Sequence, residues 1–202
     1  MNYQVVLDET LKKLDGKKKL LLHACCAPCS SYVIEYLSEY FDITILYYNP
    51  NIDTEEEFNH RLRELKRFVK EFKTKNPVKV ISLGYDNKEY LDEVVGLEKE
   101  LEGGSRCYKC FKLRLTKSCL YARSNNFDYF TTTLTISPLK NSRILNEIGH
   151  DLEQEYGINY LYSDFKKREG YKRSIVLSNK YNLYRQDYCG CQFSKNKKIK
   201  TY

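Results

Sequence analysis

The sequence predicts an α/β fold, a parallel sheet flanked by helices, and three observations support this prediction. Short apolar segments typical of strands alternate along the chain with segments of helical periodicity. No internal repeat and no long linker interrupts that alternation. The 202 residues, 42% of them apolar and 30% charged, are enough to bury one hydrophobic core. We therefore expect a single domain over residues 1–202, with its core at about 18–194 and a short basic tail at 195–202.

The first part of the chain contains two predicted strands with a helix between them. Leu20–His23 is a short apolar run after a lysine cluster and predicts a buried strand. Apolar and aromatic residues at helical spacing then predict a helix that includes Val33, Leu37, Tyr40 and Phe41. Ile43–Tyr48 is rich in β-branched and aromatic residues and predicts the second strand. The segment Asn49-Pro50-Asn51 ends this strand with residues typical of turns.

A long amphipathic helix and a third strand follow. Thr54 and Glu57 have the spacing of a capping box, which marks a helix start. The apolar face of this helix is formed by Phe58, Leu62, Leu65, Phe68 and Phe72. Val78–Leu83 predicts the third strand, and we expect another helix from Asn87.

The second half of the chain continues the alternation. Gly103-Gly104 breaks the chain before a predicted helix over Tyr108–Ser124, and Tyr129–Thr132 predicts a strand. A further helix is marked by Ile144, Leu145, Ile148, Leu152 and Tyr156. In open parallel sheets the functional site lies beyond the carboxyl ends of the strands. Because Cys25 and Cys26 directly follow the first strand, we expect them at that edge.

Eight cysteines, against one methionine and no tryptophan, are the unusual feature of the composition. No apolar run reaches the roughly 18–20 residues of a membrane span, and no signal peptide is readable, so we expect a cytoplasmic protein without a membrane partner. In a reducing compartment, closely spaced cysteines indicate metal binding or redox chemistry. Cys119 is the exception, because it continues an apolar stripe with Leu115 and Ala122, and we expect it in the core.

The other seven cysteines form three groups along the chain. Their positions are Cys25, Cys26 and Cys29, then Cys107 and Cys110, and finally Cys189 and Cys191. The first two groups lie at predicted helix starts, where partial positive charge lowers the pKa of a thiol and favours the metal-binding thiolate. The third group has one glycine between its cysteines and can close a small strained disulfide, which suits redox exchange.

These groups are compatible with several kinds of site. A zinc ion would use the pairs Cys26 with Cys29 and Cys107 with Cys110. An iron–sulfur cluster would draw four thiolates from separate segments, and a thioredoxin-like dithiol would use the first pair alone. A radical-SAM motif is excluded, because Tyr32 stands where its third cysteine would be. The last pair could also supply two further metal ligands.

Seven segments, spanning about residues 20–194, together match one known family in the family's order. They are Leu21–Ser31, Tyr48–Ile52, Arg106–Leu115, Phe127–Pro138, Ser163–Lys167, Gly170–Ser174 and Leu183–Ser194. On these segments the chain resembles the QueH-type epoxyqueuosine reductases. It departs from the family in two details, since Ala27 stands where glycine is frequent and Cys119 is additional.

The resemblance implies an α/β domain of the HUP class, which includes PP-loop nucleotide-binding folds. It also implies an oxidoreductase that removes the epoxide oxygen of epoxyqueuosine, at the wobble position of tRNA, as water to give queuosine. This is a reduction by two electrons and two protons. The implied partners are tRNA that carries epoxyqueuosine and an unidentified electron donor.

The resemblance further implies roles for the cysteines. A [4Fe–4S] cluster would be bound by Cys25, Cys26, Cys107 and Cys110. A redox-active pair would be formed by Cys189 and Cys191. The family is also described with an additional iron ion near the cluster, for which the candidate ligands are Cys29 and Asp164.

Other residues are predicted to contact the substrate. Basic runs beside tyrosines suit contacts with phosphates and unstacked bases, and we expect tRNA contacts from Lys166, Lys167, Tyr171 and Arg185. Asn49 and Asn51 follow the second strand and are expected to shape the pocket. His23 is one candidate proton donor, although a histidine in a strand is more often packed and hydrogen-bonded.

Overall fold

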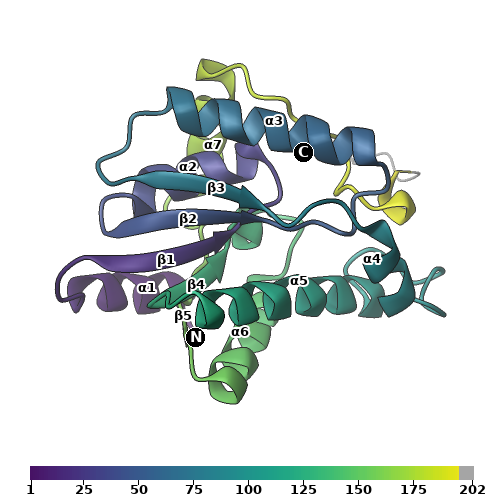
Figure 1. Ribbon diagram of the computed structural model, residues 1–202, viewed down its shortest axis with the longest axis horizontal. Helices are drawn as coiled ribbons and strands as arrows, with labels where there is room; N and C mark the ends of the chain where they lie inside the picture. The colour runs from purple at the N-terminus through teal and green to yellow at the C-terminus, as the bar shows by residue number, and fades with distance from the viewer. Residues whose placement is uncertain (196–202) are drawn as a thin grey trace.

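The computed structural model of the protein describes residues 1–195, and its centre is a five-stranded parallel sheet (Figure 1). The strands are β1 (Lys18–His23), β2 (Phe41–Tyr47), β3 (Val78–Ser82), β4 (Tyr129–Thr132) and β5 (Asn159–Tyr160). Their order in the sheet is β3-β2-β1-β4-β5, and every neighbouring pair is parallel. The predicted α/β fold with a parallel sheet is confirmed. Most of the predicted basic tail, residues 196–202, lies outside the described residues.

Helices cover both faces of this sheet. The helices are α1 (Tyr3–Lys12), α2 (Ala27–Leu37), α3 (Glu55–Glu71), α4 (Asn87–Glu93), α5 (Ser105–Ser124), α6 (Ser142–Tyr156) and α7 (Gly170–Lys180). Two short 3-10 helices cover Thr133–Ile136 and Gln192–Ser194. Figure 1 shows α2, α3 and α7 on one face and α5 and α6 on the other. Among residues 1–195, no helix combines the length and the apolar character that crossing a membrane requires.

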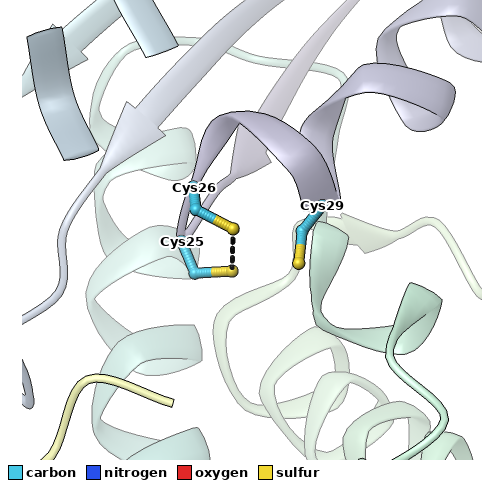
Figure 2. A group of neighbouring side chains, drawn as sticks. All are labelled: Cys25, Cys26 and Cys29. Carbon is cyan, nitrogen blue, oxygen red and sulfur yellow. Dashed lines mark hydrogen bonds between the residues drawn. The ribbon is translucent and has the colours of Figure 1, made fainter. Parts of the chain in front are cut away.

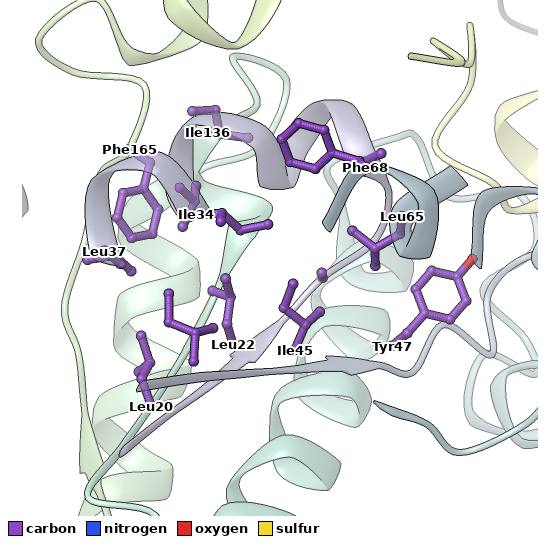
Figure 3. Packing of buried hydrophobic residues seen from close by; sticks show 14 of the residues in the cluster. Leu20, Leu22, Ile34, Leu37, Ile45, Tyr47, Leu65, Phe68, Ile136 and Phe165 are labelled. Atoms are coloured by element: carbon purple, nitrogen blue, oxygen red, sulfur yellow. The ribbon is translucent and has the colours of Figure 1, made fainter. Parts of the chain in front are cut away.

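The core has two parts, one on each face of the sheet. Leu20 and Leu22 of β1 point into the part beneath α2 and α3, where Figure 3 shows them with Ile34 and Leu65. Leu21, between them, joins the part covered by α5 and α6. Because β1 is buried on both faces, its sequence reads as a continuous apolar run.

Cys119 belongs to the second part of the core. Its side chain is fully buried, and its thiol lies 3.8 Å from the carbonyl oxygen of Leu152 on α6. The predicted core position of Cys119 is therefore confirmed.

Most predicted elements agree with the structure, and the strand at Tyr129–Thr132 agrees at both ends. Thr54 caps α3 as its spacing predicts, because its hydroxyl oxygen accepts from the Glu57 N–H at 3.3 Å. The helix predicted through Phe41 is wrong at its end. That helix ends at Leu37, and Phe41 opens β2, where it pairs with Lys18 and packs its ring against Tyr129.

The start of α5 also differs from the prediction. The helix begins at Ser105, three residues before the expected Tyr108, so Cys107 lies inside its first turn. Arg106 stabilises this start, since its guanidinium donates to the carbonyl oxygens of Leu97, Glu98 and Glu100 in the preceding turns. The sequence did not predict α1, α7 or the two-residue β5.

The sheet order places β1 at a switch point. The chain crosses from β1 to β2 and β3 on one side, and β4 and β5 lie on the other side. In open α/β sheets the crevice beyond such a reversal is where ligands bind. The residues that directly follow β1 and β4 are therefore placed to form a site.

Candidate metal centre

Three sulfurs lie together in the turn between β1 and α2. The Sγ atoms of Cys25, Cys26 and Cys29 are all within 4.8 Å of one another, and those of Cys25 and Cys26 are 3.6 Å apart. Figure 2 shows the three thiols facing a common space at the start of α2. Cys26 is the N-cap residue of this helix, and Pro28 fits its first turn because the N–H that proline lacks has no partner there.

The three thiols share their charge unequally. Hydrogen bonds from Cys26 and Cys29 hold the pKa of Cys25 well below its usual range. The two donors hold their own protons more tightly in return. The hydrogen bond to Cys25 raises the pKa of Cys26 to about 11, and it also raises the pKa of Cys29. Of these three thiols, Cys25 alone has a lowered pKa, and its cause is the hydrogen bonds from its two neighbours and not the predicted effect of the helix start. Three neighbouring cysteine sulfurs, those of Cys25 and Cys26 buried and that of Cys29 half-buried, are a donor set that fits a soft metal ion or an iron–sulfur cluster.

Cys107 and Cys110 lie in the first turns of α5. The Cys107 sulfur accepts from the Gly103 N–H at 3.2 Å, and Cys110 is buried. Burial raises the pKa of both thiols, that of Cys110 to about 11, so the helix start does not produce the predicted lowering here either. Among residues 1–195, these two sulfurs do not join the compact group of Cys25, Cys26 and Cys29.

Arg114 connects the two groups. Its side chain is buried, and its Nη1 lies 3.9 Å from the Cys110 sulfur. The same guanidinium donates from Nε to His23, two residues before Cys25, at 3.3 Å, and from Nη2 to Asn49 at 2.6 Å. The start of α5 is therefore tied to the carboxyl end of β1.

Cys189 and Cys191 form a close pair after α7. Their Sγ atoms are 3.4 Å apart, and Gly190 between them has a φ of +112°, which favours glycine. The hydrogen bond between the two thiols, together with Lys140 and Ser194, holds the pKa of Cys189 well below its usual range. The same hydrogen bond raises the pKa of Cys191. Within this pair, Cys189 therefore forms the thiolate more readily than Cys191, which suits dithiol exchange.

One pocket of about 440 Å³ is lined by cysteines of the first and last groups. Its lining includes Cys25 and Cys29 from the first group and Cys189 from the last. Cys110 completes the arrangement, because it packs in one small apolar cluster with Cys191 and Tyr90. Segments that are far apart in sequence therefore meet at the edge of the sheet that the sequence predicts.

Two polar residues of the pocket were not predicted. Gln186 donates from Nε2 to the Cys26 sulfur at 3.0 Å, which links the segment before Cys189 to the first group. Burial opposes the charge of Lys140, but the sulfurs of Cys25, Cys29 and Cys189 outweigh it and raise the pKa of this lysine. Nothing in the local sequence marks either residue. The position of Arg114 could have been predicted from the sequence, because it lies four residues after Cys110 and therefore on the same face of the helix.

The predicted pocket residues near β1 have structural roles. Asn49 accepts from Arg114 and donates to the Ala24 carbonyl oxygen at 2.9 Å, so it orients the arginine. Asn51 is buried beside Gly190. His23 is fully buried and lies 2.8 Å from the Thr132 hydroxyl. Burial and the neighbouring Arg114 lower the pKa of His23 to about 3, which agrees with a packed, neutral histidine.

The predicted substrate contacts fall into two places. Tyr171 and Arg185 line the pocket of the cysteines, and Arg185 is exposed. Lys167 lines a different pocket, together with Asp164. The Asp164 carboxylate accepts from Lys166 at 2.6 Å and from Ser142 at 3.1 Å. The structure therefore does not bring Asp164 to Cys29, whose neighbours are Cys25 and Cys26.

Comparison with known proteins gives one consistent result. The family model described as "Epoxyqueuosine reductase QueH" matches residues 20–197 of the chain. A protein of that name from Streptococcus pyogenes serotype M1 is 44% identical over 199 residues, covering 96% of this chain and 78% of the relative. One from Staphylococcus epidermidis is 42% identical and covers 97% and 87%. One from Thermotoga maritima is 32% identical and covers 87% and 89%.

Proposed function

From the premise that this chain belongs to the epoxyqueuosine reductase QueH family, we propose that it removes the epoxide oxygen of epoxyqueuosine in tRNA to give queuosine. It is an oxidoreductase of tRNA processing, as its relatives are named. The observation that supports this site is that Cys25, Cys29 and Cys189 line one pocket, while Cys110 packs against Cys191 in the neighbouring apolar cluster. The alternatives of a zinc-stabilised protein and a thioredoxin-like protein are not favoured.

The reaction needs two electrons and two protons. Both carbon–oxygen bonds of the epoxide break, a carbon–carbon double bond forms, and the oxygen leaves as water. Closing a disulfide between Cys189 and Cys191 releases two electrons and two protons, so oxidation of this pair balances the reduction of one epoxide. The 3.4 Å separation of their sulfurs supports that role. An electron donor, unidentified here, then restores the dithiol.

We propose that a [4Fe–4S] cluster is held by Cys25, Cys26, Cys107 and Cys110. The buried sulfurs after β1 and the tie from Arg114 to Cys110 support this ligand set. Such a cluster, when bound, supplies electrons and a Lewis-acidic metal in the pocket. Cys29 lies beside these ligands and would supply a thiolate to an additional iron, whereas Asp164 would have to leave its contact with Lys166 to join it.

We propose that residues 1–202 form a single catalytic domain of the HUP class. The parallel order β3-β2-β1-β4-β5, with the site after β1, supports this assignment. Because the substrate is tRNA, the expected location is the cytoplasm. Tyr171 and Arg185 are proposed to contact the modified nucleotide region at the pocket, and Lys166 and Lys167 to contact phosphates farther along the tRNA.

Substitution of Cys107 by alanine tests the assignment of the metal centre. Anaerobically purified protein is expected to contain iron and sulfide and to absorb visible light near the blue end. Cys107→Ala should lose this chromophore, and the rate of epoxide loss should fall more than about 100-fold, beyond the usual cost of changing an outer-shell partner of a metal.

Cys119→Ala is the matched control, because Cys119 lies on the same helix but in the core. It should keep both the chromophore and the turnover. A colourless wild-type protein that holds only zinc would contradict the proposed function. A Cys107→Ala variant that keeps chromophore and turnover would contradict the ligand set.

A further inference from the structure

Arg61 is a buried arginine on α3, beside the turn that contains Cys189 and Cys191. Its side chain is 1% exposed, and its Nε donates to the Glu57 carboxylate at 2.7 Å. Its Nη1 lies 3.4 Å from the Cys189 carbonyl oxygen, and its guanidinium lies over the Tyr188 ring, 5.1 Å from the ring centre. Burying a guanidinium is costly, so a helix that needed only to pack on the core would carry an apolar residue here.

The other side of the same turn is also held. The Asp53 N–H donates to the Gly190 carbonyl oxygen at 3.0 Å, and the Tyr188 hydroxyl donates to the Asp53 carboxylate at 3.1 Å. A Cβ atom at Gly190 would lie 3.1 Å from Ile52 and 3.2 Å from Nη1 of Arg61. The backbone from Tyr188 to Gly190 is therefore fixed between α3 and the loop that precedes it.

We propose that Arg61 is a positioning residue that holds the Cys189-Gly190-Cys191 turn in the conformation from which its disulfide closes; this rests on the proposed redox role of the pair. A free dithiol turn has conformational freedom that it loses when the disulfide forms. Arg61 removes part of that freedom beforehand, so the cost of closure is smaller. The pair is then a stronger reductant, which suits donation of electrons to the epoxide.

A second effect of Arg61 has the opposite sign. A positive charge near the pair stabilises the thiolate and makes the dithiol a weaker reductant. The guanidinium contacts the Cys189 carbonyl oxygen and the Tyr188 ring, however, and Lys140 is the cation that acts on the Cys189 sulfur. The positional effect is therefore expected to prevail. Lysine at position 61 separates the two effects, since it keeps the charge but not the planar group that reaches both partners.

The sequence makes the pair measurable by itself. Trypsin cleaves after Arg185 and Lys195, and the peptide between these sites contains Cys189 and Cys191 but no other cysteine. The full-length, metal-loaded protein is equilibrated anaerobically with mixtures of reduced and oxidised glutathione, alkylated, digested and analysed by mass spectrometry. When the disulfide forms, one oxidised glutathione takes the two electrons and two protons and becomes two reduced molecules.

The variants are Arg61→Met, Arg61→Lys and Tyr188→Leu. The last removes the ring from the same contact without leaving Glu57 unpaired, and it serves if the Arg61 variants do not fold. Arg67→Met is the matched control, because Arg67 is also on α3 and donates to carbonyl oxygens of the same C-terminal stretch, at Tyr181 and Asn182. That contact lies away from the thiols.

All three variants should shift the equilibrium toward the dithiol by about tenfold, which is ~30 mV, and Arg67→Met should not shift it. If the dithiol–disulfide equilibrium constants of all three variants lie within twofold of the wild-type constant, the role of Arg61 is overturned. The proposed redox pair would not be affected by that result. The positioning role would also be overturned if Arg61→Lys has the wild-type equilibrium constant and Arg61→Met shifts toward the disulfide. The charge of residue 61, and not its position, would then be the cause. If the wild-type peptide never forms the disulfide, the redox pair of the proposed function fails, and this inference with it.

Discussion

Arg114 fixes a permanent positive charge among the buried thiols. Its guanidinium reaches Cys110, His23 and Asn49 at once, and arginine does not lose its proton at any physiological pH. A fixed cation in a buried site favours the ionised form of neighbouring thiols without titrating itself. At Cys110, burial outweighs this cation and raises the pKa of the thiol to about 11, so Arg114 offsets only part of the cost of a thiolate there.

Arg185 tests the tRNA contacts at the scale of one residue. It is exposed at the pocket, and its Nη1 donates to the Ser178 hydroxyl at 3.2 Å, so it has a defined position without an acidic partner at that atom. If it contacts a phosphate, Arg185→Gln should weaken tRNA binding and reduce the slope of log Kd against log salt concentration by about 1. Binding is measured by filter retention or anisotropy over a series of salt concentrations.

Lys73→Gln is the control for this measurement, because Lys73 is exposed beside the C-terminal end of α3 and does not line the cysteine pocket. It should leave both affinity and slope close to the wild-type values. An unchanged slope in Arg185→Gln would exclude the phosphate contact.

At the scale of elements, Gly149 allows α6 to approach β5. A Cβ atom at this position would lie 2.4 Å from the ring of Tyr160, which is buried. Helix propensity alone predicts that Gly149→Ala stabilises the protein by roughly 1 kcal/mol. We expect the reverse, a loss of ~1–3 kcal/mol in the free energy of unfolding, because the added methyl overpacks the contact. Denaturant unfolding measures this difference.

Asp151→Ala, at an exposed position of the same helix, is the comparison. It should change the free energy of unfolding by less than about 0.5 kcal/mol. A stabilised Gly149→Ala protein would mean that β5 moves away at no cost and that the contact does not set the packing.

The elements also show what local sequence can and cannot predict. The central strands and the start of α3 follow from apolar runs and a capping residue, which are local properties. Phe41 was misassigned because its spacing from Leu37 suits a helix, and only pairing with Lys18 on β1 places it in a strand. The helix α7 has a modest apolar face, and its contact with α2 comes from the fold as a whole.

The candidate site also has features that local sequence predicts and contacts that only the fold creates. Cysteine spacing and the position after a strand predict which sulfurs matter and at which edge they lie. The contacts of Gln186 with Cys26 and of Arg114 with Asn49 join segments that are distant in sequence, so no local pattern contains them. The position of Asp164 is a similar case, because its contact with Ser142 depends on the packing of α6.

At the scale of the whole molecule, the proposed metal centre would join segments from distant parts of the chain. Cys25 and Cys26 follow β1, Cys107 and Cys110 lie on α5, and the pair after α7 closes the same pocket. A ligand that binds only the folded arrangement stabilises it. Metal removal should therefore affect global stability, not only the site.

Removal of the metal is expected to lower the unfolding temperature. If the proposed cluster contributes ~3 kcal/mol, metal-loaded protein should unfold roughly 6–12 °C above the iron-free protein in anaerobic calorimetry. Cys119→Ala should show a similar difference between its loaded and iron-free forms, whereas Cys107→Ala should show none. Equal unfolding temperatures for loaded and iron-free wild type would mean that the cysteine groups are held together by the polypeptide alone.

The position of Gln186, Cys189 and Cys191 late in the chain has a consequence for biosynthesis. The ribosome synthesises Cys25, Cys26, Cys107 and Cys110 before Gln186. The segment around Gln186 covers Cys26, because Gln186 donates to the Cys26 sulfur. Nascent domains acquire structure from their N-terminal parts first. The cavity is therefore uncovered while translation continues, and a delivery protein that hands over preassembled inorganic sulfide and iron would find its widest entrance at that stage.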